Sequence, residues 1–197
     1  MHSETYSKTG RLVGMAVLIA VIVILQILGS FVRFGSFSVS LVLIPIVVGA
    51  AVFGAAAGAL FGAAFGAVVL INCVIGVDLG GFVLWSANPF ATAVLCLFKG
   101  AAAGYAAGLT YSALRKANTY LGVVCAALVC PVVNTGIFIA AMLLIYRDTL
   151  TAWAGGASVL YFAFVGLAGV NFLIETVVNV VLSPAVMRII RAVKIVV

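Results

Sequence analysis

Charged residues are scarce in this sequence. Only 14 of its 197 residues are charged, ten Lys or Arg and four Asp or Glu, and they make up 7% of the chain, against roughly 25% in an ordinary soluble domain. A soluble globule of this size could not cover its surface with so few charges. The composition therefore excludes soluble enzymes, disordered proteins and nucleic-acid-binding proteins. The 66% share of apolar residues predicts an integral membrane protein.

Motifs for metal binding, phosphate binding and catalysis are missing as well. The single histidine is His2, and the four cysteines contain no CxxC pair, so they are expected to be small buried hydrophobic residues. The sequence contains no GxxxxGK[ST] motif to hold nucleotide phosphates and no acid–base pair beside a nucleophile. We therefore expect no enzyme activity, no metal site and no cofactor bound by this chain.

The intervals between charged residues predict six membrane-spanning helices. A span needs about 20 mostly apolar residues; Arg11 and Arg33 enclose 21 uncharged residues, and Arg33 and Asp78 enclose 44, enough for two spans. The apolar runs are continuous, which favours helices over a barrel. The first run is too long for a cleaved signal peptide and should be a retained helix. We expect one all-α membrane domain over 1–197, with helices at about 12–32, 38–54, 57–76, 90–113, 119–145 and 158–191.

Basic residues are distributed unequally between the two ends of these helices. One end, which also holds both termini, has seven of them: Lys8, Arg11, Arg115, Lys116, Arg188, Arg191 and Lys194. The other end has Arg33 and Arg147, together with Asp78 and Asp148. Because short cytoplasmic segments carry an excess of Lys and Arg, both termini are expected in the cytoplasm. The net charge of +6 is then an orientation signal, not a nucleic-acid-binding patch.

Small residues recur every four positions in three of the predicted helices. They are Ala16 and Ala20 in the first helix, Gly58, Gly62 and Gly66 in the third, and Gly100, Gly104 and Gly108 in the fourth. Residues four apart share one face of a helix, and small side chains let a second backbone approach that face closely. Packing within the bundle and docking of a separate protein are both compatible with these stripes.

Several polar residues fall inside the predicted spans or near their ends, where polar groups usually face a bundle interior or a cavity. They are Asn72, Lys99, Asn134, Thr135, Asn171, Glu175 and Asn179. One interpretation is an ion pair between Lys99 and Glu175, with the amides clamping the helices together. The other is a binding site for a small solute that has hydroxyl, amide or carboxylate groups.

The predicted outer loops add aromatic and polar residues at the end opposite the termini. The loop after the first helix has Arg33 among phenylalanines, and the loop from 76 to 90 has Trp85 and Asn88. Tryptophan is typical of the membrane interface, so anchoring is one interpretation of Trp85. Alternatively, these loops form a lid over a cavity, in which case Arg33, Trp85 and Asn88 join the set of candidate substrate-binding residues.

Five segments, in this order along the chain, resemble those of one known family. They are Ala16-x-x-x-Ala20, the segment 37–47 (FSVSLVLIPIV), the segment 53–58 (FGAAAG, similar to an FGPxAG turn without its proline), the segment 99–104 (KGAAAG, similar to KGxxAG), and the segment 131–136 (PVVNTG). Together they resemble the substrate-binding S component of energy-coupling factor (ECF) vitamin transporters, over nearly the whole chain.

The resemblance implies a mechanism and partners. An S component holds a vitamin in an outward cavity formed by its helices four to six and its outer loops, joins a transmembrane T component and two ATPases that use ATP, and topples in the membrane to release the vitamin inside. The implied T-component docking surface includes Ala16, Ala20, Gly58 and Gly62. The implied location is the prokaryotic plasma membrane.

The polar set suits pantothenate, which has a carboxylate, an amide and two hydroxyls, and the sequence looks most like pantothenate-type members. Helices four to six lack the crowd of inner aromatic residues that would favour flavin or pterin stacking. Riboflavin, folate and other small vitamins nevertheless stay open. So do a membrane assembly protein without a ligand and an autonomous secondary transporter, although no repeat relates residues 1–98 to 99–197, which disfavours the transporter.

Overall fold

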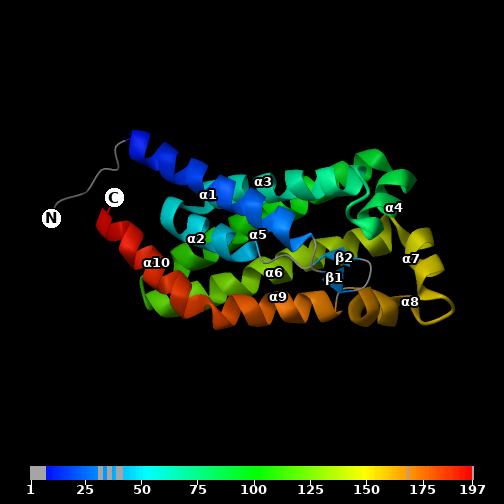
Figure 1. Cartoon of the computed structure of the whole chain (residues 1–197). Coiled ribbons are helices and arrows are strands. Elements are labelled where there is room, and N and C mark those ends of the chain that lie inside the picture. The colour runs from blue at the N-terminus through cyan, green and yellow to red at the C-terminus, as the bar shows by residue number, and fades with distance from the viewer. Residues whose placement is uncertain (1–7, 31–32, 35–36, 39–41, 168, 197) are drawn as a thin grey trace.

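Residues 8–30, 33–34, 37–38, 42–167 and 169–196 are described by the computed structural model of the chain, and they form an elongated helical bundle (Figure 1). The longer helices are α1 (Lys8–Gly29), α2 (Leu43–Phe53), α3 (Ala55–Val74), α5 (Pro89–Leu114), α6 (Thr119–Leu144), α9 (Gly169–Val181) and α10 (Ser183–Val196). The shorter helices are α4 (Leu79–Ala87), α7 (Arg147–Ala154), α8 (Val159–Tyr161) and the π-helical segment η1 (Phe162–Leu167). Two strands of two residues, β1 (Arg33–Phe34) and β2 (Phe37–Ser38), pair antiparallel.

Five helical segments in the described part of the chain are long and apolar enough to cross a membrane. They are Lys8–Gly29, Ala55–Val74, Pro89–Leu114, Thr119–Leu144 and Val159–Val181. Helix α2 is also apolar but has only 11 residues, about 16 Å at 1.5 Å per residue, or half of a typical hydrocarbon core. The prediction of an all-helical membrane protein is confirmed, and the chain is a multi-pass membrane protein.

The second predicted helix, 38–54, begins later than expected, at Leu43, because Phe37–Ser38 pairs with β1. The regions predicted as outer loops contain α4 and α7. Helix α4 is stabilised at its start by Asp78, whose Oδ1 accepts a hydrogen bond of 2.9 Å from the Gly81 N–H.

The last predicted helix, 158–191, is interrupted twice. The chain widens into the π-helical segment η1, and it turns again at Leu182 between α9 and α10. Pro184 follows that turn, and proline lacks the N–H that would continue the hydrogen-bond ladder of α9. Ser183, just before it, donates a hydrogen bond of 2.9 Å from Oγ to the Asn179 carbonyl. As a result, α10 departs from the direction of α9 and rises across one end of the bundle (Figure 1).

Helices α3 and α5 pack backbone to backbone along their glycines. Gly58 and Gly62 on α3 are buried against Gly104 and Gly100 on α5, and a Cβ at any of the four would overlap the facing carbonyl group. The stripes therefore serve close helix packing inside the bundle. This corrects the expectation that Gly58 and Gly62 lie on a docking surface for another protein.

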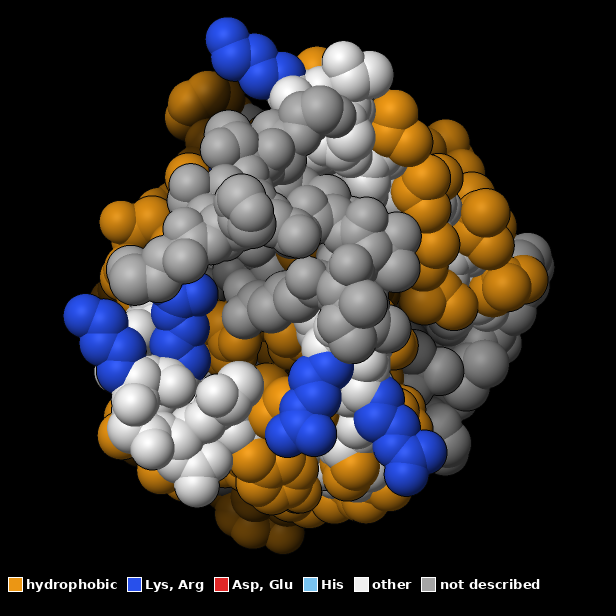
Figure 2. All heavy atoms as spheres, turned by 90° about the vertical axis from the view of Figure 1, so that its left-hand side faces the viewer, with side chains coloured by type: hydrophobic (Ala, Val, Ile, Leu, Met, Phe, Trp, Pro, Cys, Tyr) orange, Lys and Arg blue, Asp and Glu red, His pale blue; other side chains and the backbone are white. Residues whose placement is uncertain are grey.

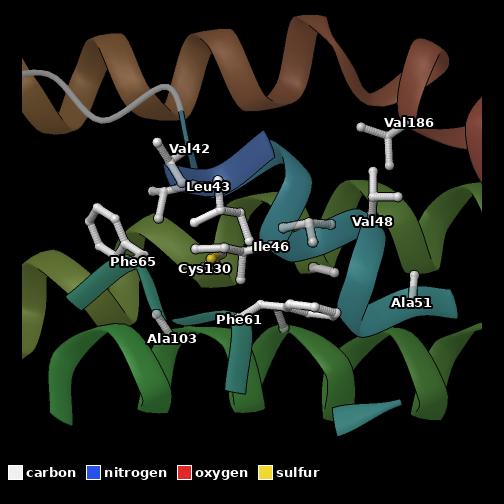
Figure 3. Close-up of a cluster of buried hydrophobic side chains, with 14 of the residues drawn as sticks. Val42, Leu43, Ile46, Val48, Ala51, Phe61, Phe65, Ala103, Cys130 and Val186 are labelled. Carbon is white, nitrogen blue, oxygen red and sulfur yellow. The ribbon is translucent and has the colours of Figure 1, made fainter. Parts of the chain in front are cut away.

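The larger apolar core lies between α2, α3, α5 and α6 (Figure 3). Ile46 and Phe61 are fully buried at its centre, and Val186 of α10 packs beside Val48 of α2. Gly54 joins α2 to α3 at φ +96°, a conformation that glycine adopts without strain. The turn lies within the segment 53–58 that resembles an FGPxAG turn.

The start of α1, the turn between α5 and α6, and α10 lie at one end of the bundle, which we call the basic end (Figure 1). Its exposed basic residues are Lys8, Arg11, Arg115, Lys116, Arg188 and Arg191. Figure 2 shows Lys and Arg side chains on this face and no Asp or Glu among the described residues. Helices α4 and α7 lie at the opposite end, which we call the far end.

Candidate functional site

Lys99 lines a small cavity near the far end of the bundle. The cavity is formed by α3, the start of α4, α5 and α6, and its lining residues are Val69, Cys73, Asp78, Gly81, Leu84, Thr92, Leu95, Cys96, Lys99 and Phe138. The Lys99 Nζ lies 5.3 Å from the centre of the Phe138 ring, within the range of cation–π attraction. Asp78 places a carboxylate on the same cavity. The space is about 30 Å³, enough for about two water molecules.

Glu175 and Asn134 are two further buried polar residues of the predicted set. Glu175 on α9 is only 6% exposed and interacts electrostatically with Cys130 of α6. Asn134 is one helical turn from Cys130 and one turn from Phe138, so the three share one face of α6. The Asn134 Oδ1 is buried without a hydrogen-bond partner among the described residues. Lys99 contacts the Phe138 ring, and Glu175 is not among the described residues that line the Lys99 cavity.

Asn88, Thr92 and Tyr146 join α5 to the segment that connects α6 and α7. The Asn88 carbonyl accepts hydrogen bonds from the Thr92 Oγ1 at 2.9 Å and from the Tyr146 hydroxyl at 3.2 Å. The two hydroxyls are themselves 2.7 Å apart. Burial raises the pKa of Tyr146, while the hydrogen bond with Thr92 acts in the opposite direction. This cluster positions Thr92, which is the member of the three that lines the Lys99 cavity.

Comparison with protein-family models matches residues 10–187 to the family described as ECF transporter, substrate-specific component. The match spans most of the 197 residues. The chain belongs to this family. Comparison with curated proteins gives no match.

Two of the predicted residues make structural contacts in this ECF component. Asn88 is the N-cap of α5, and its Oδ1 accepts a hydrogen bond of 3.1 Å from the Ala91 N–H. Asn72 connects α3 to the end of α1, because its Nδ2 donates a hydrogen bond of 2.6 Å to the Ser30 Oγ. The Asn-Pro pair at 88–89 is a typical helix start, so the capping role of Asn88 was readable from the sequence.

None of the remaining predicted residues is among the described residues that line the Lys99 cavity. Thr135 lines a separate pocket of about 180 Å³ between α6, η1 and α9, whose other lining residues, such as Phe164 and Phe172, are mainly apolar. Trp85 is half-buried in α4. Arg33 belongs to β1 and Asn171 to α9, but the side chains of both lie outside the described part of the structure.

The sequence interpretation missed Phe138, Thr92 and Asp78 as site residues. Phe138 follows Asn134 by four residues, so helical periodicity alone places both on one face of α6. That signal was available but did not distinguish Phe138 from the many other apolar residues of the helix. Thr92 and Asp78 reach the cavity only because α4 folds back against α3 and α5.

The predicted docking pair lies on the outside of the protein. Ala16 and Ala20 of α1 are exposed, whereas Ile22 and Gln26, further along the same helix, are buried. After the correction for Gly58 and Gly62, these two alanines are the members of the predicted docking set that remain at the surface.

Proposed function

We propose that this chain captures a small vitamin from outside a prokaryotic cell and delivers it inward together with an ECF T component and two ATPases. Membership of the substrate-specific family supports this function. The structural observation that carries the proposal is the Lys99 ammonium in a cavity within the bundle. An ionisable residue inside a membrane protein is costly and usually functional. In this mechanism the partner ATPases use ATP, and this chain only binds and releases the solute.

The proposed topology has six spans in the plasma membrane, with both termini in the cytoplasm. The sixth span is α2, which is short but apolar and buried in the larger core. The basic end supports the orientation, since its exposed Lys and Arg residues follow the positive-inside rule. The cavity of Lys99 then lies toward the outside, where the solute is captured.

Pantothenate is the preferred substrate. Its carboxylate suits the Lys99 ammonium as a charge-assisted partner. Its hydroxyl and amide hydrogens suit an acceptor such as the buried Asn134 Oδ1, which has no partner among the described residues. Riboflavin, folate and other small vitamins are the alternatives. Space for about two water molecules is too small for any of these vitamins, so binding requires the cavity to widen at Phe138 or at the outer segments.

A thermal-shift screen of the purified full chain against a panel of vitamins tests the proposal. We expect one vitamin to raise the melting temperature at micromolar concentration, and calorimetry to give a stoichiometry of one. Lys99→Ala should abolish the shift for a vitamin that has a carboxylate. A panel in which no vitamin shifts the melting temperature would instead support an assembly protein whose polar residues only join helices.

A further inference from the structure

Helix α10 is amphipathic and lies across the basic end. Its buried side consists of Val186, Met187 and Ile190, which pack against α2 and α6. Its exposed side includes Arg188 and Arg191. Because α10 turns away from α9 at Leu182, it is inclined to the long helices and does not continue along their axis (Figure 1). Helix α10 therefore covers the basic end of the bundle and presents its arginines on the side away from the core.

Apolar side chains are exposed next to these arginines. Val181 is 67% exposed at the end of α9, and Ile189 is 46% exposed between Arg188 and Arg191. Val177, one turn earlier on α9, is also exposed, so exposed apolar side chains occur on both sides of the turn at Leu182. Arginine stems can lie along such a surface while their guanidinium groups reach the headgroup layer. A protein partner with an acidic surface would pair with the arginines but would leave the exposed apolar side chains Val181 and Ile189 without an apolar contact.

The two arginines are available for an external ligand. Arg188 and Arg191 have no hydrogen-bond or ion-pair partner among the described residues, unlike Arg11, whose Nη2 donates a hydrogen bond of 3.3 Å to the Phe53 carbonyl. No acidic side chain of the described residues is visible on this face in Figure 2. A guanidinium group can donate two parallel hydrogen bonds to one phosphate.

We infer that Arg188 and Arg191 form a binding site for the phosphate headgroup of an anionic phospholipid. The exposed apolar residues Val181 and Ile189 contact its acyl chains. Helix α10 then fixes the basic end of the protein at the level of the headgroups. This site is separate from the Lys99 cavity, which lies near the far end, and the inference does not depend on which vitamin is carried.

The test measures the melting temperature of the purified full chain in micelles while phosphatidylglycerol is added, with phosphatidylcholine as the neutral lipid. We expect phosphatidylglycerol to raise the melting temperature at much lower concentration than phosphatidylcholine, and high salt to weaken the effect. Arg188→Gln/Arg191→Gln should need about 30-fold more phosphatidylglycerol, since each basic residue near an anionic surface contributes a factor of about five.

Two variants control the experiment. Arg188→Lys/Arg191→Lys keeps both charges and should retain most of the response, while Arg147→Gln removes an exposed arginine on α7 at the far end and should retain all of it. Without lipid, all variants should melt close to the wild type because the side chains are exposed.

Three results would overturn the inference. They are an unchanged phosphatidylglycerol response in Arg188→Gln/Arg191→Gln, an equal loss in Arg147→Gln, or an equal response to phosphatidylcholine. An unchanged lipid response combined with lost T-component assembly would assign this face to a protein partner. A matching stabilisation by inorganic phosphate alone would show a site for a free anion and not for a lipid.

Discussion

The ammonium of Lys99 on α5 lies 5.3 Å from the centre of the Phe138 ring on α6. A cation–π contact of this kind contributes about 0.5–1 kcal/mol at an exposed site and about 2 kcal/mol when it is shielded from water. The ring therefore compensates part of the desolvation of Lys99 and occupies one side of its charge. A substrate carboxylate has to approach the ammonium from another side or displace the ring, which makes Phe138 part of the proposed site.

Lys99→Gln should weaken binding of a vitamin that has a carboxylate by about 10- to 100-fold, because a hydrogen bond to a charged group contributes about 1.5–3 kcal/mol. Lys99→Arg keeps the charge and should lose less. Calorimetric titration of both variants measures the difference. If Lys99→Gln bound the vitamin as tightly as the wild type, Lys99 would not be a substrate-binding residue.

Asn134→Leu should separate a ligand-binding role from a packing role. The Asn134 Oδ1 is buried with no hydrogen-bond partner in the described part of the chain, so an apolar side chain of similar size removes an unsatisfied polar group and should leave the melting temperature of the empty protein within a few degrees or raise it. Vitamin affinity should fall by about tenfold. The opposite pattern, a large loss of stability with normal vitamin affinity, would show that Asn134 holds helices together and does not bind the vitamin.

Gly62→Ala should destabilise the bundle by about 2 kcal/mol or more, because the added Cβ meets the Gly100 carbonyl and α3 and α5 must separate. Gly136→Ala in α6 is the matched control. A Cβ at Gly136 meets nothing within 4 Å, so the higher helix propensity of alanine should stabilise α6 by about 0.5–1 kcal/mol. The free energy of unfolding in micelles is measured for both variants. An equal change in the two would contradict the close contact of α3 with α5.

Ala16→Leu or Ala20→Leu should weaken assembly with the T component, because a larger side chain on this exposed stripe prevents close approach of a partner helix. Vitamin binding by the isolated chain should be unchanged. Co-purification with the T component and calorimetry measure the two properties separately. Equal loss of both would indicate misfolding and not a docking defect.

Tyr146→Phe should lower stability at neutral pH by about 1 kcal/mol, since it removes the hydroxyl shared by Thr92 and the Asn88 carbonyl. The folded state has a raised pKa for Tyr146, so its contribution is complete below the unfolded value of about 10 and is lost as the pH rises through the folded pKa. The difference between the wild type and Tyr146→Phe should therefore shrink at high pH. Tyr161→Phe, at an exposed position, should show little change at any pH.

Helical structure was largely predictable from the sequence, and the exceptions have local causes. The ends of α5 and α6 lie within one residue of the predicted helices 90–113 and 119–145, because apolar runs and the caps Asn88 and Asn118 are local signals. Helices α4 and α7 were not predicted, since eight or nine residues between long spans carry little periodicity. The break at Leu182 was missed although Pro184 follows it.

The candidate site was only partly predictable. Lys99 and Asn134 stood out because polar residues are rare in apolar helices. Their neighbours did not, since the contact of Lys99 with Phe138 depends on how α5 and α6 are each rotated about their axes. Single-helix patterns contain no information about that rotation relative to a second helix.

The sequence by itself determined that this is a multi-pass helical membrane protein with a basic end, because continuous apolar runs must satisfy their backbone hydrogen bonds within helices and the charged residues mark where those runs stop. Its motifs also indicated the ECF family. Only the tertiary structure decided that Gly58 and Gly62 face α5 and that α10 crosses the basic end. A glycine stripe permits close packing against any helix backbone, and only the contacts between segments distant in the sequence decide which helix packs there.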